Sequence, residues 1–147
     1  MNRNIGFKER RYIEELRILT KSTALDCIID ERFERIIYVV KKGDMGLAIG
    51  KKGENIRRMQ NVLGKRIEMV ESADDEDEFI RNIFKPIQIS RIVHEDESGT
   101  IHVILERKSD LGMSIGKGGC NVEKARILLK RFLCRDDIGI MVEGDTE

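Results

Sequence analysis

One segment of this sequence occurs twice. Residues 46–56 align without gaps with residues 112–122, which lie 66 positions downstream. Both segments contain a Gly-Lys-x-Gly tetrapeptide, and the apolar positions that follow it recur at the same spacing. A single short glycine motif carries a high risk of a false match, but recurrence of the whole segment lowers that risk. The chain is therefore an internal duplication, and its 147 residues indicate two small domains rather than one large one.

Each copy of the motif predicts a tight turn between two helices. The apolar residues on both sides of the tetrapeptide have helical spacing, and the glycines allow the backbone to turn sharply and to approach a ligand closely. The unpaired amides at the start of the second helix, together with the helix dipole, favour an anion such as a phosphate. The lysine in the turn adds a positive charge.

The patterns around the motif predict the same order of elements in both halves. The first half is expected to form a helix over 8–20, strands over 24–29 and 35–41, the two motif helices, and a strand over 66–71. The second half is expected to form a helix over 78–84, strands over 87–94 and 100–106, the motif helices, and a strand over 138–143. Both halves thus have the order α-β-β-α-α-β, which predicts the α+β class.

A family resemblance rests on the residues Leu47-Ala48-Ile49-Gly50-Lys51-Lys52-Gly53-Glu54-Asn55-Ile56-Arg57. They are similar to the core of a KH domain from the NusA family of transcription termination and antitermination factors. A KH domain clamps the backbone of about four nucleotides with its GxxG loop. The order of elements resembles that of the prokaryotic type (type II), so the resemblance implies two tandem KH domains of this type. The chain has no room for the N-terminal polymerase-binding and S1 domains of bacterial NusA, so it resembles the short, KH-only NusA-like proteins of archaea.

The resemblance implies RNA contacts in both halves. The GxxG loop would hold the sugar-phosphate backbone, and an apolar groove bordered by the last strand would receive the bases. The implied RNA-binding residues are Gly46, Leu47, Ile49, Gly50, Lys51, Lys52, Gly53, Ile56, Arg57 and Arg58 in the first half, and Gly112, Met113, Ile115, Gly116, Lys117, Gly118, Gly119 and Val122 in the second. For the aliphatic members, packing in the core is the alternative.

Gly46 and Gly112 are expected to lie inside helices, where glycine costs up to about 1 kcal/mol relative to alanine. Their presence at equivalent positions indicates a close approach, either of backbone to base or of helix to helix. The expected domains are residues 1–72 and 79–147, joined by an acidic linker at 73–78. The acidic run at 74–78 is predicted to be a solvated linker or the first turn of a helix, and an RNA mimic or a docking patch is the alternative.

Charge is distributed unequally between the halves. The chain carries 27 basic and 27 acidic residues, which argues against coating of nucleic acid by bulk attraction. Up to Glu71 there are 16 basic and 11 acidic residues, and from Ser72 onward the numbers are reversed. The first repeat is therefore expected to dominate RNA affinity.

Other residue types exclude several functions. The three cysteines are isolated, which predicts neither a disulfide framework nor a zinc site and favours a cytoplasmic location. We find no signal peptide and no apolar run that could cross a bilayer, so we expect no membrane role. The glycines do not complete a Walker loop, and the two histidines fall in a predicted hairpin. We therefore expect no enzyme, no cofactor and no metal.

The sequence thus predicts a protein that binds single-stranded RNA and acts in transcription termination or antitermination, with RNA polymerase or a transcription complex as a second partner. Two alternatives stay open. One is a KH factor in ribosome assembly or RNA decay. The other is a protein-interaction scaffold whose second KH domain is degenerate.

Overall fold

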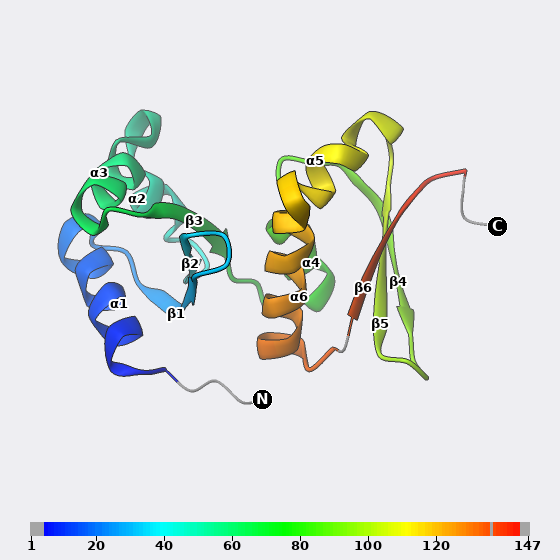
Figure 1. Cartoon of the computed structure of the whole chain (residues 1–147), viewed down its shortest axis with the longest axis horizontal. Coiled ribbons are helices and arrows are strands. Elements are labelled where there is room, and N and C mark those ends of the chain that lie inside the picture. Colours follow the sequence, from blue (N-terminus) through cyan, green and yellow to red (C-terminus); the bar gives the residue numbers. More distant parts are fainter. Residues whose placement is uncertain (1–4, 136, 145–147) are drawn as a thin grey trace. The chain divides into compact units, whose positions relative to one another are not determined.

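The computed structural model describes residues 5–135 and 137–144, and it divides into two compact units. One unit ends at Asp74 and the other begins at Asp75. Each unit contains helices and a three-stranded sheet, which confirms the α+β class and the predicted order of elements (Figure 1).

The first unit consists of α1 (Phe7–Thr20), β1 (Ala24–Asp30), β2 (Arg35–Val40), α2 (Met45–Ile49), the 3-10 turn η1 (Lys51–Gly53), α3 (Glu54–Leu63) and β3 (Arg66–Glu71). Strands β1 and β2 form an antiparallel hairpin, and β3 pairs with β2 in parallel, so that β2 is the central strand. The segment from α2 to α3 is therefore the crossover connection between two parallel neighbours. The GxxG tetrapeptide lies in the middle of this crossover.

Burial of β2 explains how the first unit is held together. Every residue of β2 is buried, and Ile36, Tyr38 and Val40 pack in a core with Leu16 of α1 and Met59 of α3. The Tyr38 hydroxyl donates a hydrogen bond to the Tyr12 carbonyl at 2.7 Å. Burial raises the pKa of Tyr38 far above its usual value, so the phenol remains a neutral donor.

A buried cluster of charged residues lies at the start of the same strand. The side chain of Arg35 is fully buried and its guanidinium lies 2.8 Å from a carboxylate oxygen of Asp30 and 3.1 Å from one of Glu68. Burial opposes the charge on Arg35, but its hydrogen bond to Asp30 and its pairing with Glu68 outweigh that effect and raise its pKa. Arg35 thus links all three strands of the sheet.

The second unit consists of α4 (Glu76–Phe84), β4 (Ile89–Glu95), β5 (Thr100–Leu105), the 3-10 turn η2 (Lys108–Asp110), α5 (Leu111–Ile115), the 3-10 turn η3 (Lys117–Gly119), α6 (Cys120–Leu133) and β6 (Asp137–Val142). Its sheet repeats the first: β4 and β5 are antiparallel, and β6 pairs with β5 in parallel. Helix α6 has 14 residues and is longer than α3, which has 10.

Two sequence predictions need correction here. The strand predicted over 87–94 begins at Ile89, because the Ile87 amide donates to the Phe84 carbonyl at 3.0 Å and closes a turn over residues 84–87. The acidic linker predicted at 73–78 is shorter than expected, because its residues 76–78 belong to α4, which begins at Glu76. The Asp75 carboxylate accepts a hydrogen bond from the Glu78 amide at 2.9 Å and caps the helix. The alternative of a first helical turn is thus confirmed for residues 76–78, where the helix dipole favours acidic side chains.

Candidate nucleic-acid interface

The first GxxG loop turns the chain between α2 and α3 with two glycines in conformations that other residues rarely adopt. Gly50 has φ 77° and ψ 169°, and Gly53 has φ 74° and ψ 16°. A Cβ on Gly50 would lie 2.8 Å from the backbone nitrogen of Asn55. Glycine is therefore required at position 50 both for the backbone angles and for space.

The second loop has the same geometry. Gly116 has φ 81° and ψ 164°, and a Cβ there would lie 2.8 Å from the backbone nitrogen of Asn121. The Gly53 amide donates to the Gly50 carbonyl at 3.1 Å, and the Gly119 amide donates to the Gly116 carbonyl at 3.0 Å. The duplication in sequence is thus a duplication of loop conformation.

An asparagine fastens each loop. The side-chain nitrogen of Asn55 donates to the Leu47 carbonyl at 2.7 Å, and that of Asn121 donates to the Met113 carbonyl at 2.6 Å. Each bond ties the helix after the loop to the helix before it. The set of predicted site residues omitted both asparagines, although their recurrence at equivalent positions was a visible signal. We assign them the role of positioning the loop.

The two loops differ at their third residue. Lys52 adopts a left-handed backbone conformation with φ 56°, which is unfavourable for a residue other than glycine. Gly118 has a similar φ of 66°, which glycine adopts without this strain. In the first loop a guanidinium nitrogen of Arg57 donates to the Lys52 carbonyl at 2.6 Å. Glu123 stands where Arg57 would be in the second copy, and its carboxylate pairs with Arg126 at 2.9 Å. Arg57 therefore supports the strained loop directly.

The cations of the first loop are available to a ligand. Lys51, Lys52 and Arg58 are exposed, and so is Lys117 in the second loop. None of these four side chains forms an ion pair within the described part of the chain. The backbone amides and cations around each loop thus suit an anionic ligand.

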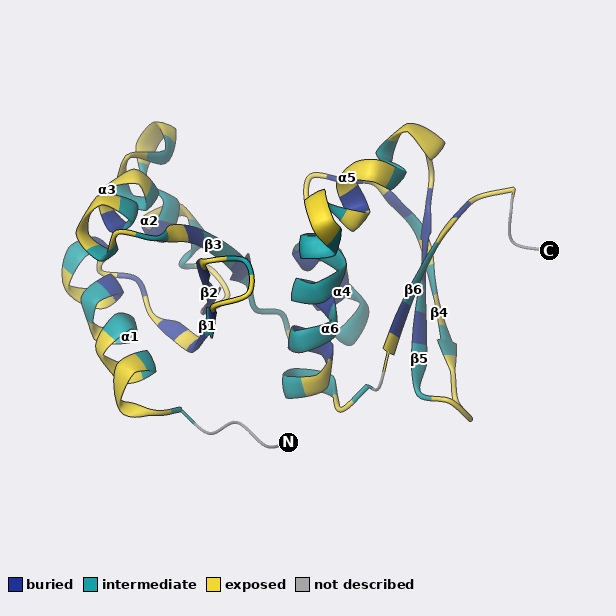
Figure 2. Ribbon diagram, in the orientation of Figure 1, coloured by how far each residue is buried: buried dark blue, intermediate teal, exposed yellow. Residues whose placement is uncertain are grey.

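Several of the predicted groove residues are exposed rather than packed in the core. Leu47 is 50% exposed, Met113 57% and Ile115 39%, whereas their neighbours Ala48 and Ser114 are buried. Figure 2 shows both exposed and buried colouring along α5. Ile49, Ile56 and Val122 are partly buried, and Ile56 packs against the core of the first unit. Packing in the core therefore explains the partly buried side chain of Ile56. It does not explain the apolar side chains of Leu47 and Met113, which are exposed. Helix α2 contacts the edge strand β3, and α5 contacts the edge strand β6.

Gly46 and Gly112 lie on the exposed side of the short helices. A Cβ built on either residue has no heavy atom within 4 Å. Close approach of helix to helix, one of the two reasons considered for these glycines, is therefore wrong. Approach of a base to the backbone stays a prediction.

Replacing Gly46 with alanine tests that prediction. Because the site is helical and open, we expect Gly46→Ala to raise the unfolding free energy by about 0.5–1 kcal/mol. If a base packs against this position, the same variant binds single-stranded RNA more weakly. Chemical denaturation and RNA titration of Gly46→Ala and Gly112→Ala measure both quantities. Unchanged RNA affinity in both variants would remove these glycines from the site.

Histidines and cysteines form no further site in the described residues. His94 lies 2.7 Å from Asp77, and His102 lies 2.9 Å from Glu95, so both rings are paired with carboxylates. None of the three cysteines, all of which lie in the described residues, forms a disulfide. Across residues 5–135 and 137–144, no group of three or more potential metal ligands gathers, and no helix is long and apolar enough to cross a membrane.

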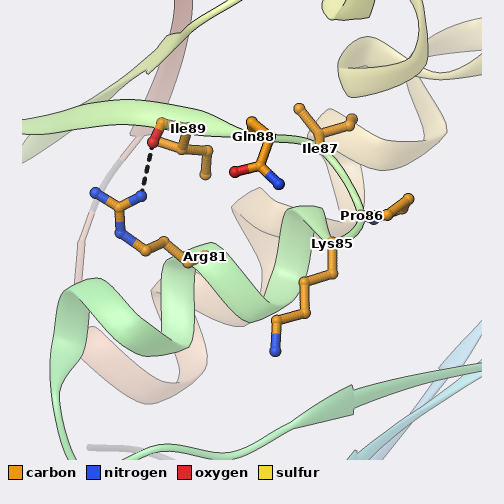
Figure 3. A pocket seen from close by; sticks show the side chains of 6 residues that line it. All are labelled: Arg81, Lys85, Pro86, Ile87, Gln88 and Ile89. Atoms are coloured by element: carbon orange, nitrogen blue, oxygen red, sulfur yellow. Dashed lines mark hydrogen bonds between the residues drawn. The ribbon is translucent and has the colours of Figure 1, made fainter.

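The second unit also contains a cavity of about 370 Å³ between the end of α4 and the start of β4 (Figure 3). Its lining residues are Arg81, Lys85, Pro86, Ile87, Gln88 and Ile89. The Arg81 guanidinium donates to the Ile89 carbonyl at 2.7 Å and so fastens α4 to β4. None of the predicted RNA-binding residues lines this cavity, so it is separate from the GxxG loop.

Comparisons with known proteins identify the family. The KH domain family matches residues 9–89, which include most of the first unit and the beginning of the second. "Probable transcription termination protein NusA" of Methanocaldococcus jannaschii is 35% identical over 82% of this chain and 65% of its own length, so this chain spans about two thirds of that relative. The protein of the same name in Halobacterium salinarum is 30% identical over 94% of this chain and 98% of its own length.

A solved structure agrees with these matches. The crystal structure of APE1850 superimposes with a TM-score of 0.80 at 36% sequence identity, covering 92% of this chain and 99% of that one. By sequence and by fold, the chain belongs to the KH-domain proteins and, among them, to the archaeal NusA-like family.

Proposed function

We propose that this protein binds single-stranded RNA through two type II KH domains and acts in transcription termination or antitermination. The domains correspond to the two compact units, which divide between Asp74 and Asp75. The observation that supports this most is the paired GxxG loop. Two loops of equal backbone geometry each present lysine next to exposed apolar side chains on a short helix. The names of the archaeal relatives support the role in transcription.

In this mechanism each loop holds the RNA backbone and each short helix receives bases. Phosphate oxygens accept hydrogen bonds from loop amides and pair with Lys51 and Lys52, or with Lys117 in the second copy. Leu47 and Met113 offer apolar contact to the bases, and Gly46 and Gly112 leave room for them. Asn55 and Asn121 keep the loop in place through their bonds to the preceding helix. RNA polymerase or another part of the transcription complex is the second partner that we propose.

The experiment is a fluorescence-anisotropy titration of a randomised single-stranded RNA pool, with single-stranded DNA and duplex RNA as controls. We expect a preference for RNA. Lys51→Asp/Lys52→Asp replaces two cations with anions, so it is expected to weaken binding by more than about tenfold at low salt. Aspartate tolerates the left-handed conformation at position 52, so the loop backbone is preserved. Equal melting temperatures of wild type and variant serve as the control for folding.

The second loop is tested by Lys117→Asp/Gly118→Asp in the same titration. It has one lysine where the first has two, and Glu123 replaces Arg57. We therefore expect a smaller loss than in the first loop. No loss at all would favour the alternative in which the second unit contacts protein instead of RNA. If the wild-type protein binds none of the three nucleic acids at low salt, the proposed function is contradicted. Binding of a protein partner then becomes the better explanation of the two GxxG loops.

A further inference from the structure

The internal duplication allows the two copies to be compared residue by residue. A cation that both copies keep is a better candidate for function than one that only a single copy carries. Basic residues of the first copy that are matched by a basic residue 66 positions later are Lys41, Lys42, Lys51, Arg58 and Lys65, which lie over Arg107, Lys108, Lys117, Lys124 and Arg131.

The structure separates these matches into three kinds. Lys65 and Arg131 are not equivalent, because Lys65 lies between α3 and β3 while Arg131 lies inside α6. Lys51 and Arg58 and their counterparts belong to the GxxG loop and the helix behind it. Lys41, Lys42, Arg107 and Lys108 remain, and the site described above does not use them. We name these four residues the junction cations, because they join the middle strand of each sheet to the short helix.

The junction cations lie in a similar turn in both units, although Lys41 directly follows β2 while Glu106 separates Arg107 from β5. The Asp44 amide donates to the Lys41 carbonyl at 2.9 Å, and the Asp110 amide donates to the Arg107 carbonyl at 3.1 Å. Each turn leads into a helix of five residues, α2 or α5, and the GxxG loop begins at the other end of that helix. At a rise of 1.5 Å per residue, five residues span roughly 7 Å. The basic turn and the GxxG loop thus lie one short helix apart.

The turn also lies beside the edge strand. The Ser72 amide, just after β3, donates to the Val40 carbonyl at 2.8 Å, and the Glu143 amide, just after β6, donates to the Leu105 carbonyl at 2.8 Å. The Glu71 carboxylate accepts from the Gly43 amide at 2.9 Å. The junction cations are therefore next to the end of the strand that borders the proposed groove.

The junction cations can bind an external phosphate with little loss of free energy from their existing ion pairs. Lys41 and Lys108 are exposed and form no ion pair in the described part of the chain. Lys42 pairs with Asp74 at 3.2 Å, with 56% and 92% of the two side chains exposed. Arg107 pairs with Asp110 at 3.2 Å, and the two side chains are 62% and 15% exposed. The exposed Lys42–Asp74 pair contributes about 0–1 kcal/mol, so an RNA phosphate can replace the Asp74 carboxylate. The Arg107 guanidinium has more N–H donors than its pair with Asp110 uses, so it can also donate to a phosphate.

We propose that the junction cations make two further phosphate contacts in each unit, one for each cation, so that RNA is held at both ends of α2 and of α5. This proposal rests on the proposed function, since it concerns the same ligand. It extends the binding site from the GxxG loop to the turn between β2 and α2, and to its equivalent between β5 and α5. These contacts are electrostatic and independent of base identity.

The test is the salt dependence of binding to the single-stranded RNA pool. Lys41→Gln/Lys42→Gln and Arg107→Gln/Lys108→Gln are compared with Lys8→Gln and Lys130→Gln, which change exposed lysines without a basic counterpart in the other copy. Each phosphate contact contributes about 0.7 to the slope of log K against log salt for a single strand. Loss of two contacts is therefore expected to reduce the slope by about 1.4 and the affinity at 0.1 M salt by about 25-fold.

Slopes equal to wild type in both double variants overturn the proposal. The control variants are expected to keep the wild-type slope, and equal melting temperatures exclude loss of fold as the cause of weaker binding. Failure of the proposed function has a different signature, because the wild type itself would then not bind RNA. If the wild type binds and Lys51→Asp/Lys52→Asp does not, while the junction variants match Lys8→Gln, only the junction contact is wrong.

Discussion

An Arg35→Met variant is expected to lose about 3–5 kcal/mol of unfolding free energy in the first unit. The side chain of Arg35 is fully buried, and its guanidinium pairs with Asp30 and Glu68. Its removal takes the buried positive charge away from Asp30 and leaves Glu68 paired with Arg66, whose side chain is 52% exposed. A loss of this size is comparable to the whole stability of a small domain.

Arg66→Met is the matched control for Arg35→Met. Arg66 pairs with the same Glu68 carboxylate at 3.1 Å, but its side chain is 52% exposed, so we expect a change of about 0–1 kcal/mol. Native-state hydrogen exchange of the β2 amides reports the stability of the first unit within the full chain. Equal exchange rates in the two variants would show that burial of the Arg35 charge is not what holds the three strands together.

Gly50→Ala is expected to disrupt the first GxxG loop more than any other single methyl addition there. The backbone angles at Gly50 are essentially restricted to glycine and would cost about 1–3 kcal/mol for alanine. The added Cβ would also lie 2.8 Å from the Asn55 backbone nitrogen, so α3 must shift. We expect RNA affinity to fall by more than tenfold, because the loop amides and the Asn55 bond to Leu47 move with the helix.

Gly64→Ala separates backbone strain from crowding. Gly64 also has a positive φ, 67°, but a Cβ there has no heavy atom within 4 Å. We expect a stability loss of about 1–2 kcal/mol, which is the cost of the left-handed conformation alone, and no change in RNA affinity. Denaturation and anisotropy titration of both variants give the comparison. An RNA affinity of Gly50→Ala equal to that of Gly64→Ala would contradict the role of the loop geometry.

Periodicity and turn residues predicted most of the fold. The strand over 66–71 was predicted to the residue, because apolar Ile67 and Met69 alternate with charged Arg66 and Glu68. The start of β4 was placed two residues too early, because apolar Ile87 continues the strand pattern although its amide is bonded back to Phe84. A local pattern does not reveal a backbone turn of this kind.

The contacts that position the candidate site were harder to predict. The bond from Arg57 to the Lys52 carbonyl and the bond from Asn55 to the Leu47 carbonyl depend on backbone geometry across the loop. The buried cluster of charged residues around Arg35 was also not visible, because an arginine at the start of a strand is usually exposed. The assignment of the GxxG residues to RNA contact stays a prediction, supported by recurrence and by their exposure.

The parallel pairing of β3 with β2 has a consequence for the order of folding. The antiparallel hairpin β1–β2 joins neighbouring segments and can form within microseconds, whereas β3 pairs only after α2, the GxxG loop and α3 have been enclosed. The same holds for β6 in the second unit. We therefore expect each hairpin to form first during synthesis, and the loop to acquire its final geometry only when the last strand of its unit has left the ribosome. Either unit would become able to bind a ligand late in its own synthesis.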